Sequence, residues 1–140
     1  MVQISDDLAW VLVGKKNCFV KGRKGGPKFT ADPYNLTGVN KKSVAGTNAK
    51  ALGIASGVDS KKRDVATVVL KTSKAGSKPS KSTHKVVLRV GRGTKRMNKT
   101  VKTLVADQYY KEEDVVLALD RVSKISKAAY RKQNGVVYSQ

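Results

Sequence analysis

The excess of positive charge limits what this chain can fold into more than any other feature of its sequence. Its 140 residues include 29 Lys and Arg against 10 Asp and Glu, which gives a net charge of +19 at pH 7. Self-repulsion destabilises a compact state with so large a surplus, and a net charge of about 2–8 is enough to keep a small domain soluble. The composition therefore predicts a protein that works against a polyanion.

A nucleic acid fits this requirement better than a membrane surface. Peripheral membrane proteins gather basic residues on an amphipathic helix or beside a lipid anchor, whereas here the basic residues are spread through Gly- and Ser-rich segments. No apolar run approaches the roughly 18 residues of a membrane span, and we find no signal peptide or lipidation motif. The single cysteine, Cys18, excludes an intramolecular disulfide and agrees with a reducing compartment. We expect no membrane partner.

The charge is distributed unevenly along the chain. Residues 65–106 contain eleven basic residues and no acidic one, and residues 14–63 carry twelve basic residues against two acidic ones. Five of the ten acidic residues lie between positions 107 and 120, so we expect the segment 112–133 to face solvent or protein. Uncompensated charge is held most easily next to phosphates, which places the expected nucleic-acid face in four basic loops. These loops are 14–28, 37–63, 73–82 and 91–99.

Apolar patterning predicts an α+β fold, in which a small antiparallel sheet from N-terminal and central hairpins accompanies two C-terminal helices and long basic loops. Residues 37–63 show no lasting period and are predicted as a loop that its partner orders. The expected strands are 8–13, paired with 17–21 across Gly14–Lys16, then 28–30, 65–72 and 84–90.

The last third of the chain is predicted to be helical. One helix is expected to begin at Asn98 or Thr100, and a second at Glu112, whose acidic first turn suits the positive end of the helix dipole. No linker or internal repeat divides the chain, so we predict a single RNA-binding domain over residues 1–140. Trp10 is expected in its core.

Enzymatic chemistry finds little support in the sequence. The only histidine, His84, has no Cys or paired carboxylate near it in sequence, and the carboxylates from Glu112 to Asp114 are explained as helix caps. The glycine-rich segments Gly22–Pro27 and Gly91–Gly93 lack the spacing of nucleotide-binding loops. We therefore expect no enzyme, no cofactor, no small-molecule substrate and no metal site.

Folded RNA is the expected form of the nucleic acid. The sequence contains no zinc finger, basic zipper or helix-turn-helix pattern, and strands with basic, glycine-rich loops suit the irregular shape of folded RNA. The predicted RNA contacts are the basic side chains of the loops and three side chains around a polar turn: Lys15, Lys16, Lys21, Arg23, Lys24, Lys28, Tyr34, Asn35, Asn40, Lys41, Lys42, Lys50, Lys74, Lys78, Lys81, Arg89, Arg92, Lys95, Arg96 and Lys99.

The order of several short motifs resembles the eukaryote-specific large-subunit ribosomal protein twenty-eight family, over roughly residues 6–130. The motifs are Leu8-x-Trp10-x-x-Val13, Asn17-Cys18-x-x-Lys21, Phe29-Thr-x-Asp-Pro-x-Asn35-Leu36 followed by Asn40, and Tyr110-x-x-x-Asp114 with Ala118 and Ser123. The resemblance implies an α+β protein at the surface of the cytosolic large subunit that binds ribosomal RNA and neighbouring ribosomal proteins without catalysis. It also implies passage through the nucleolus during assembly.

Two other interpretations stay open at this point. A nucleolar ribosome-assembly factor is similar over residues 6–55, including a turn like Asn35-Leu-Thr-Gly38, but it carries several cysteines and a long acidic extension. A free basic RNA chaperone is the other alternative. The ribosomal family usually ends in a Lys/Arg-rich tail where this chain has Gly135-Val-Val-Tyr-Ser-Gln140, which indicates a divergent member without that tail.

Overall fold

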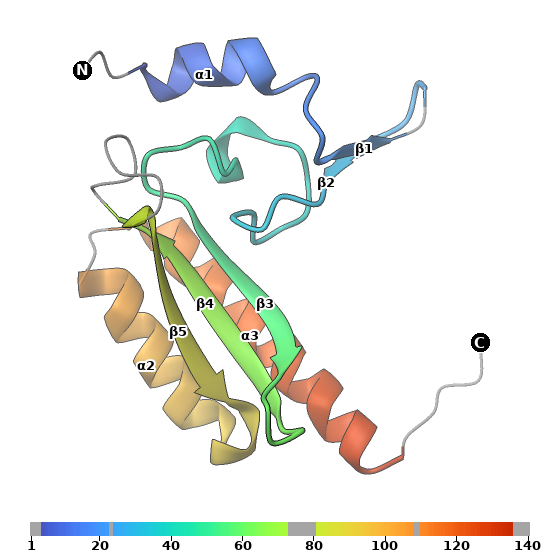
Figure 1. Ribbon diagram of the computed structural model, residues 1–140, viewed down its shortest axis with the longest axis vertical. Coiled ribbons are helices and arrows are strands. Elements are labelled where there is room, and N and C mark those ends of the chain that lie inside the picture. The colour runs from blue at the N-terminus through green and yellow to red at the C-terminus, as the bar shows by residue number, and fades with distance from the viewer. Residues whose placement is uncertain (1–3, 23, 73–80, 108–109, 136–140) are drawn as a thin grey trace. The chain divides into compact units, whose positions relative to one another are not determined.

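The computed structural model describes residues 4–22, 24–72, 81–107 and 110–135, except for the side chain of Arg92. Its elements follow the order α1, β1, β2, η1, β3, β4, β5, η3, α2 and α3 (Figure 1). The described strands form two antiparallel sheets, β1–β2 and β3–β4–β5. The predicted α+β class with two C-terminal helices is confirmed.

The chain divides into two compact units. Unit 1 comprises Met1–Gly53 and Val69–Lys85, and unit 2 comprises Ile54–Val68 and Val86–Gln140. Each strand of the three-stranded sheet has residues in both units. That the whole chain acts as one domain stays a prediction.

The first element of unit 1 is a helix, α1 (Asp6–Val13), and the predicted strand at 8–13 is wrong. Ser5 caps this helix, since its hydroxyl oxygen accepts a hydrogen bond from the Leu8 backbone N–H at 3.3 Å. Asp6 and Asp7 stand in the first turn, where the helix dipole favours anions. The cap and the two carboxylates outweigh the β propensity of the Trp- and Val-rich run. Trp10, expected in the core, is half-buried on this helix.

The N-terminal hairpin lies later in the chain than the sequence suggested. Strand β1 (Val20–Gly22) pairs with β2 (Lys28–Thr30), so that Gly22 lies opposite Lys28. The predicted hairpin of 8–13 with 17–21 is therefore wrong, because its first strand is helical. The short strand predicted at 28–30 is confirmed as the second strand of this hairpin.

The segment predicted as one long loop contains regular structure. A short 3-10 helix, η1 (Lys42–Val44), is followed by strand β3 (Leu52–Val58), which pairs with β4 (Asp64–Lys71). Leu52, Gly53 and Ile54 are buried. Gly53 packs so closely on residue 33 that an added Cβ would lie 1.7 Å from the Pro33 carbonyl oxygen. Close backbone approach requires glycine here, and this glycine concealed the strand in the sequence.

Polar contacts order the polypeptide before β3. The Asp32 carboxylate accepts a hydrogen bond from the Gly46 N–H at 3.1 Å, and the Lys71 ammonium donates to the carbonyl oxygens of Gly46 and, at 3.1 Å, Asn48. Burial lowers the pKa of Lys71, although the nearby carboxylates of Asp32 and Asp6 act in the opposite direction. Lys71 therefore supports unit 1 from within.

Unit 2 contains part of the three-stranded sheet and two helices. Strands β4 and β5 (Thr83–Arg89) confirm the strands predicted at 65–72 and 84–90. After β5 come a short 3-10 helix, η3 (Val90–Arg92), and the helices α2 (Thr94–Asp107) and α3 (Glu112–Gln133). Helix α2 begins several residues before the predicted start. The two helices pack on one another and lie along the sheet in Figure 1. The buried core of this unit comprises Ile54, Val65, Ala66, Val68, Val90, Met97, Val101, Val105, Tyr110, Ala118, Val122 and Ala129.

Candidate nucleic-acid interface

The turn between β3 and β4 presents basic side chains at one end of unit 2. Its backbone is closed by hydrogen bonds from the Asp59 N–H to the Arg63 carbonyl oxygen at 2.9 Å and from the Lys62 N–H to the Asp59 carbonyl oxygen at 2.8 Å. Lys62 has a φ of 55°, a left-handed conformation that glycine adopts far more readily than lysine. A lysine in this place presents a cation at a conformational cost.

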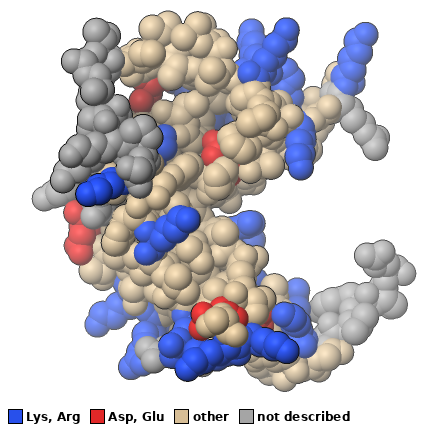
Figure 2. Space-filling view, in the orientation of Figure 1, with Lys and Arg blue, Asp and Glu red and all other residues tan. Residues whose placement is uncertain are grey.

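This turn borders a hollow of about 600 Å³, which we call the basic hollow. Its volume lies in the range of about 300–1,000 Å³ that is usual for ligand sites. Figure 2 shows Lys and Arg gathered at the lower edge of the view, with a few acidic side chains among them, where Figure 1 draws the β3–β4 turn. The basic hollow is lined by Lys62, Arg63, Asp64, Arg89, Gly91, Lys132 and Gln133.

The cations of the basic hollow are only partly neutralised. Lys132 pairs with Asp64 at 3.1 Å, and Arg63 pairs with Asp59 at 3.2 Å. Among the described residues, Lys62 and Arg89 have no ion-pair or hydrogen-bond partner for their charged groups. Two charges are therefore available to an anionic ligand, and the paired cations add to the positive potential around them.

Arg89 connects this site with the beginning of α2. It also lines a smaller hollow of about 300 Å³, shared with Arg96, Met97 and Thr100. Because Arg89 borders both hollows, positive charge runs from the β3–β4 turn towards the first turns of α2.

The charges of α2 oppose its helix dipole. Exposed Lys95 and Arg96 lie in the first turn, which has no acidic residue, and Asp107 ends the helix. Each such unfavourable placement costs about 0.3–1 kcal/mol at an exposed site. Helix α3 shows the reverse and stabilising pattern, with acidic residues from Glu112 onward in its first turn and basic residues in its last. The terminal charges of α3 thus stabilise that helix, whereas those of α2 do not stabilise it.

In unit 1 the predicted basic contacts lie mostly on exposed turns and strands. Lys42 forms an ion pair with Asp7 and so is partly neutralised within the chain. The hairpin β1–β2 presents three more lysines, Lys21, Lys24 and Lys28. Besides Lys42, the exposed lysines of unit 1 that were predicted to contact RNA are Lys15, Lys16, Lys21, Lys24, Lys28, Lys41, Lys50 and Lys81.

Three predicted contacts in unit 1 have internal roles. The Asn35 side-chain oxygen accepts hydrogen bonds from the backbone N–H groups of Thr37 at 2.9 Å and Gly38 at 2.8 Å. The Asn40 amide donates to the Gly14 carbonyl oxygen at 2.8 Å, and half-buried Tyr34 lies under the Lys71 ammonium, 5.4 Å from its ring centre. Asn35 thus closes its own turn, whereas Asn40 and Tyr34 contact residues distant in sequence, and the contact of all three with RNA stays a prediction.

The structure brings together only some of the predicted residues. Arg89, Lys95, Arg96 and Lys99 belong to unit 2, with Lys95, Arg96 and Lys99 following one another in the first half of α2. Arg23, Lys74, Lys78 and the side chain of Arg92 lie outside the described residues.

Sequence reasoning missed three residues that line the basic hollow. Lys62 and Arg63 belong to a segment predicted to be RNA-facing but were not singled out, and Lys132 was assigned to a helix expected to face solvent or protein. The Asp-Ser-Lys-Lys-Arg run at 59–63 carries a turn signal that could have found the first two. Only the tertiary structure brings Lys132 to them.

Other kinds of site find no structural support in the part of the chain that is described. No group of three or more His, Cys, Asp or Glu side chains is placed there to hold a metal ion. None of the described helices is long and apolar enough to cross a membrane.

Comparison with known protein families identifies the chain. The family model for the ribosomal L28e protein family matches residues 8–128. The chain belongs to this family. Membership in the L28e family gives it a structural, non-enzymatic role in the large ribosomal subunit, with ribosomal RNA and ribosomal proteins as partners. The family resemblance of the sequence motifs is thereby confirmed.

Proposed function

We propose that this L28e protein binds and stabilises folded ribosomal RNA, and that the basic hollow together with the first half of α2 makes its main RNA contact. The observation that carries the proposal is the pair of unpartnered cations, Lys62 and Arg89, within a hollow that two further cations border. A phosphate–ribose backbone supplies the missing counter-charge at this place.

The form of the surface favours irregular RNA over a regular duplex. Its cations come from a β-turn, a strand and the ends of two helices, so that their charges follow no single helical groove. RNA–protein contacts of this kind recognise shape and phosphate position. The first turn of α2 adds backbone N–H groups, which favour phosphate at a helix N-terminus. We expect the protein to act in cytoplasmic ribosomes after passing through the nucleolus during assembly.

The test is the salt dependence of binding to transcribed fragments of large-subunit ribosomal RNA. Each phosphate contact contributes about 0.7–0.9 to the slope of log affinity against log salt, and we expect a parental slope above about 4 in magnitude. The double variant Lys62→Gly/Arg89→Gln should reduce that slope by about 1.4–1.8, the share of two contacts. Glycine at position 62 also suits the positive φ, so that the turn is retained.

A matched control removes the same charge elsewhere. Lys124→Gln/Lys127→Gln changes two exposed cations of α3, of which Lys124 is already paired with Asp120 at 2.7 Å. We expect the control to keep the parental slope. Equal reductions in the two double variants would show that RNA responds to net charge alone and that the basic hollow has no special part.

A further inference from the structure

Helix α1 carries its apolar stripe on the outside. Ile4, Leu8, Val11 and Leu12 follow the spacing i, i+4, i+7, i+8, which places them on one face of the helix and its N-terminal extension. Their exposed fractions are 61%, 50%, 73% and 65%, respectively. Amphipathic helices of globular proteins normally bury this face. Here the described helix has no buried residue at all.

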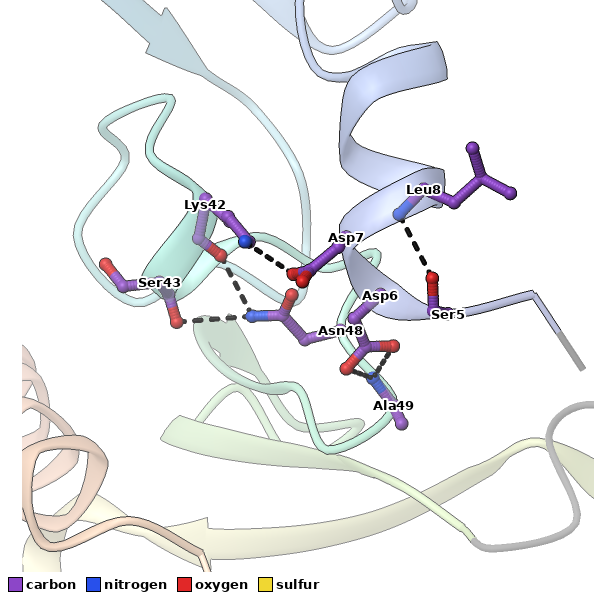
Figure 3. Close-up of polar contacts among 8 residues, drawn as sticks. All are labelled: Ser5, Asp6, Asp7, Leu8, Lys42, Ser43, Asn48 and Ala49. Atoms are coloured by element: carbon purple, nitrogen blue, oxygen red, sulfur yellow. Dashed lines mark hydrogen bonds and ion pairs between the residues drawn. The ribbon is translucent and has the colours of Figure 1, made fainter.

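Polar contacts of the two aspartates fix this orientation. Both carboxylate oxygens of Asp6 accept from the Ala49 N–H at 3.1 Å, and Asp7 forms an ion pair with Lys42. Figure 3 shows these carboxylates directed at the segment 42–49, while the side chain of Leu8 points away from it. The outward stripe is therefore a consequence of how unit 1 holds the helix.

The charges around the stripe select the kind of occupant. Residues 1–14 contain Asp6 and Asp7 and no Lys or Arg, and the four stripe side chains have no hydrogen-bond donor. Phosphate contacts need cations or donors, and helices that lie on anionic membranes carry Lys and Arg on their polar face. A second copy of the chain would bring another +19. An uncharged protein surface needs no cation or hydrogen-bond donor from the stripe, needs no basic face on the helix and brings no further positive charge.

We propose that the stripe Ile4–Leu8–Val11–Leu12 is a docking surface for another protein of the large subunit, one that presents an apolar groove to α1. A short helix with anchors at i, i+3 and i+4 is a recurrent way of filling such a groove. This interaction is separate from RNA binding, because it uses the acidic and apolar beginning of the chain.

The test is site-specific photo-crosslinking in large subunits isolated from cells of the source organism. A benzophenone amino acid replaces Val11, the most exposed residue of the stripe, and the subunits are irradiated and treated with ribonuclease. We expect a ribonuclease-resistant adduct with one large-subunit protein. An adduct that ribonuclease removes, an adduct of two copies of this chain, or the absence of any adduct would overturn the proposal.

Two variants, each carrying the same crosslinker, show whether the stripe itself is responsible. Leu8→Gln/Leu12→Gln should lower the adduct yield by about tenfold or more, as expected when two interface anchors are lost. Val58→Gln/Val116→Gln, which changes two exposed apolar residues of unit 2, should keep the yield; an equal loss in this control would contradict the proposal. The isolated Leu8→Gln/Leu12→Gln protein should keep the parental Tm and RNA salt slope, so that failure here and failure of the RNA-binding proposal are distinguishable.

Discussion

Exchanging Lys95 and Arg96 for Glu should stabilise the free protein and weaken its RNA complex. Both side chains are exposed in the first turn of α2, which has no acidic residue. Reversal removes two unfavourable dipole interactions and adds two favourable ones, each of about 0.3–1 kcal/mol, so the free energy of unfolding should rise by about 1–4 kcal/mol. That gain corresponds to an increase in Tm of roughly 3–13 °C for a chain of this length.

Two measurements on the same preparations check both halves of this prediction. Urea unfolding at low salt gives the free energy of unfolding, and the salt dependence of binding to ribosomal RNA fragments gives the loss of phosphate contacts. Replacing two attractive contacts by repulsion should reduce the salt slope by about 1.4–1.8 or more. The opposite signs of the two effects distinguish a functional surface from a stabilising one.

Lys124→Glu/Lys127→Glu is the matched control, because it lowers the net charge by the same amount. These residues lie before the last turn of α3, where the helix dipole has little effect, and the change breaks the Lys124–Asp120 ion pair. Here the free energy of unfolding should fall slightly and the salt slope should stay near the parental value. If the Lys95/Arg96 variant is no more stable than the parent, or if both pairs weaken RNA binding equally, our assignment of the α2 charges is wrong.

The remaining predictions concern the stability of unit 1. Gly53→Ala should lower the free energy of unfolding by about 3 kcal/mol or more, because its Cβ would lie 1.7 Å from the Pro33 carbonyl oxygen. In the control Gly57→Ala, on the same strand, the Cβ meets nothing nearer than 3.7 Å, so this variant should be neutral in urea unfolding. Equal losses of stability in the two variants would refute the close approach of Gly53 to Pro33. Lys71→Met should cost about 1–3 kcal/mol, since two carbonyl oxygens lose a charged donor. The pKa of Lys71 is lowered from its ordinary value of 10.5, so just below pH 10.5 the unfolded chain binds more protons and the parent gains stability as pH rises through that window. Unfolding curves of Lys71→Met over the same pH range should lack this gain in stability. An identical pH dependence in the parent and in Lys71→Met would show that Lys71 is not the source of the gain.

The strands and helices that the sequence predicted are those whose local signals agree with their packing. The β-branched run at 65–72 became β4, and the acidic first turn at Glu112 became the start of α3. The segment 8–13 was wrongly predicted as a strand because its Trp and Val residues favour strands. Ser5 and the two aspartates that follow it are the signal for the start of a helix.

What could not be predicted depends on contacts between residues distant in sequence. Strand β3 was missed because Gly53, placed there by the close approach of Pro33, interrupts its apolar period. The basic hollow was missed for the same kind of reason. Lys132 joins Lys62 and Arg89 through the packing of α3 and the sheet, and no pattern within α3 marks that lysine as different from Lys124 or Lys127.

Co-sedimentation of the tagged chain with ribosomal particles in sucrose gradients at high salt tests most directly whether the protein is a structural part of the large subunit that is held by RNA at the basic hollow. We expect the chain to stay with mature large subunits and Lys62→Gly/Arg89→Gln to lower its occupancy there, whereas Lys124→Gln/Lys127→Gln should not. A chain confined to precursor particles would indicate an assembly factor, and a chain released entirely at high salt would indicate a free RNA chaperone. Either result would contradict a structural role in the large subunit that depends on RNA binding at the basic hollow.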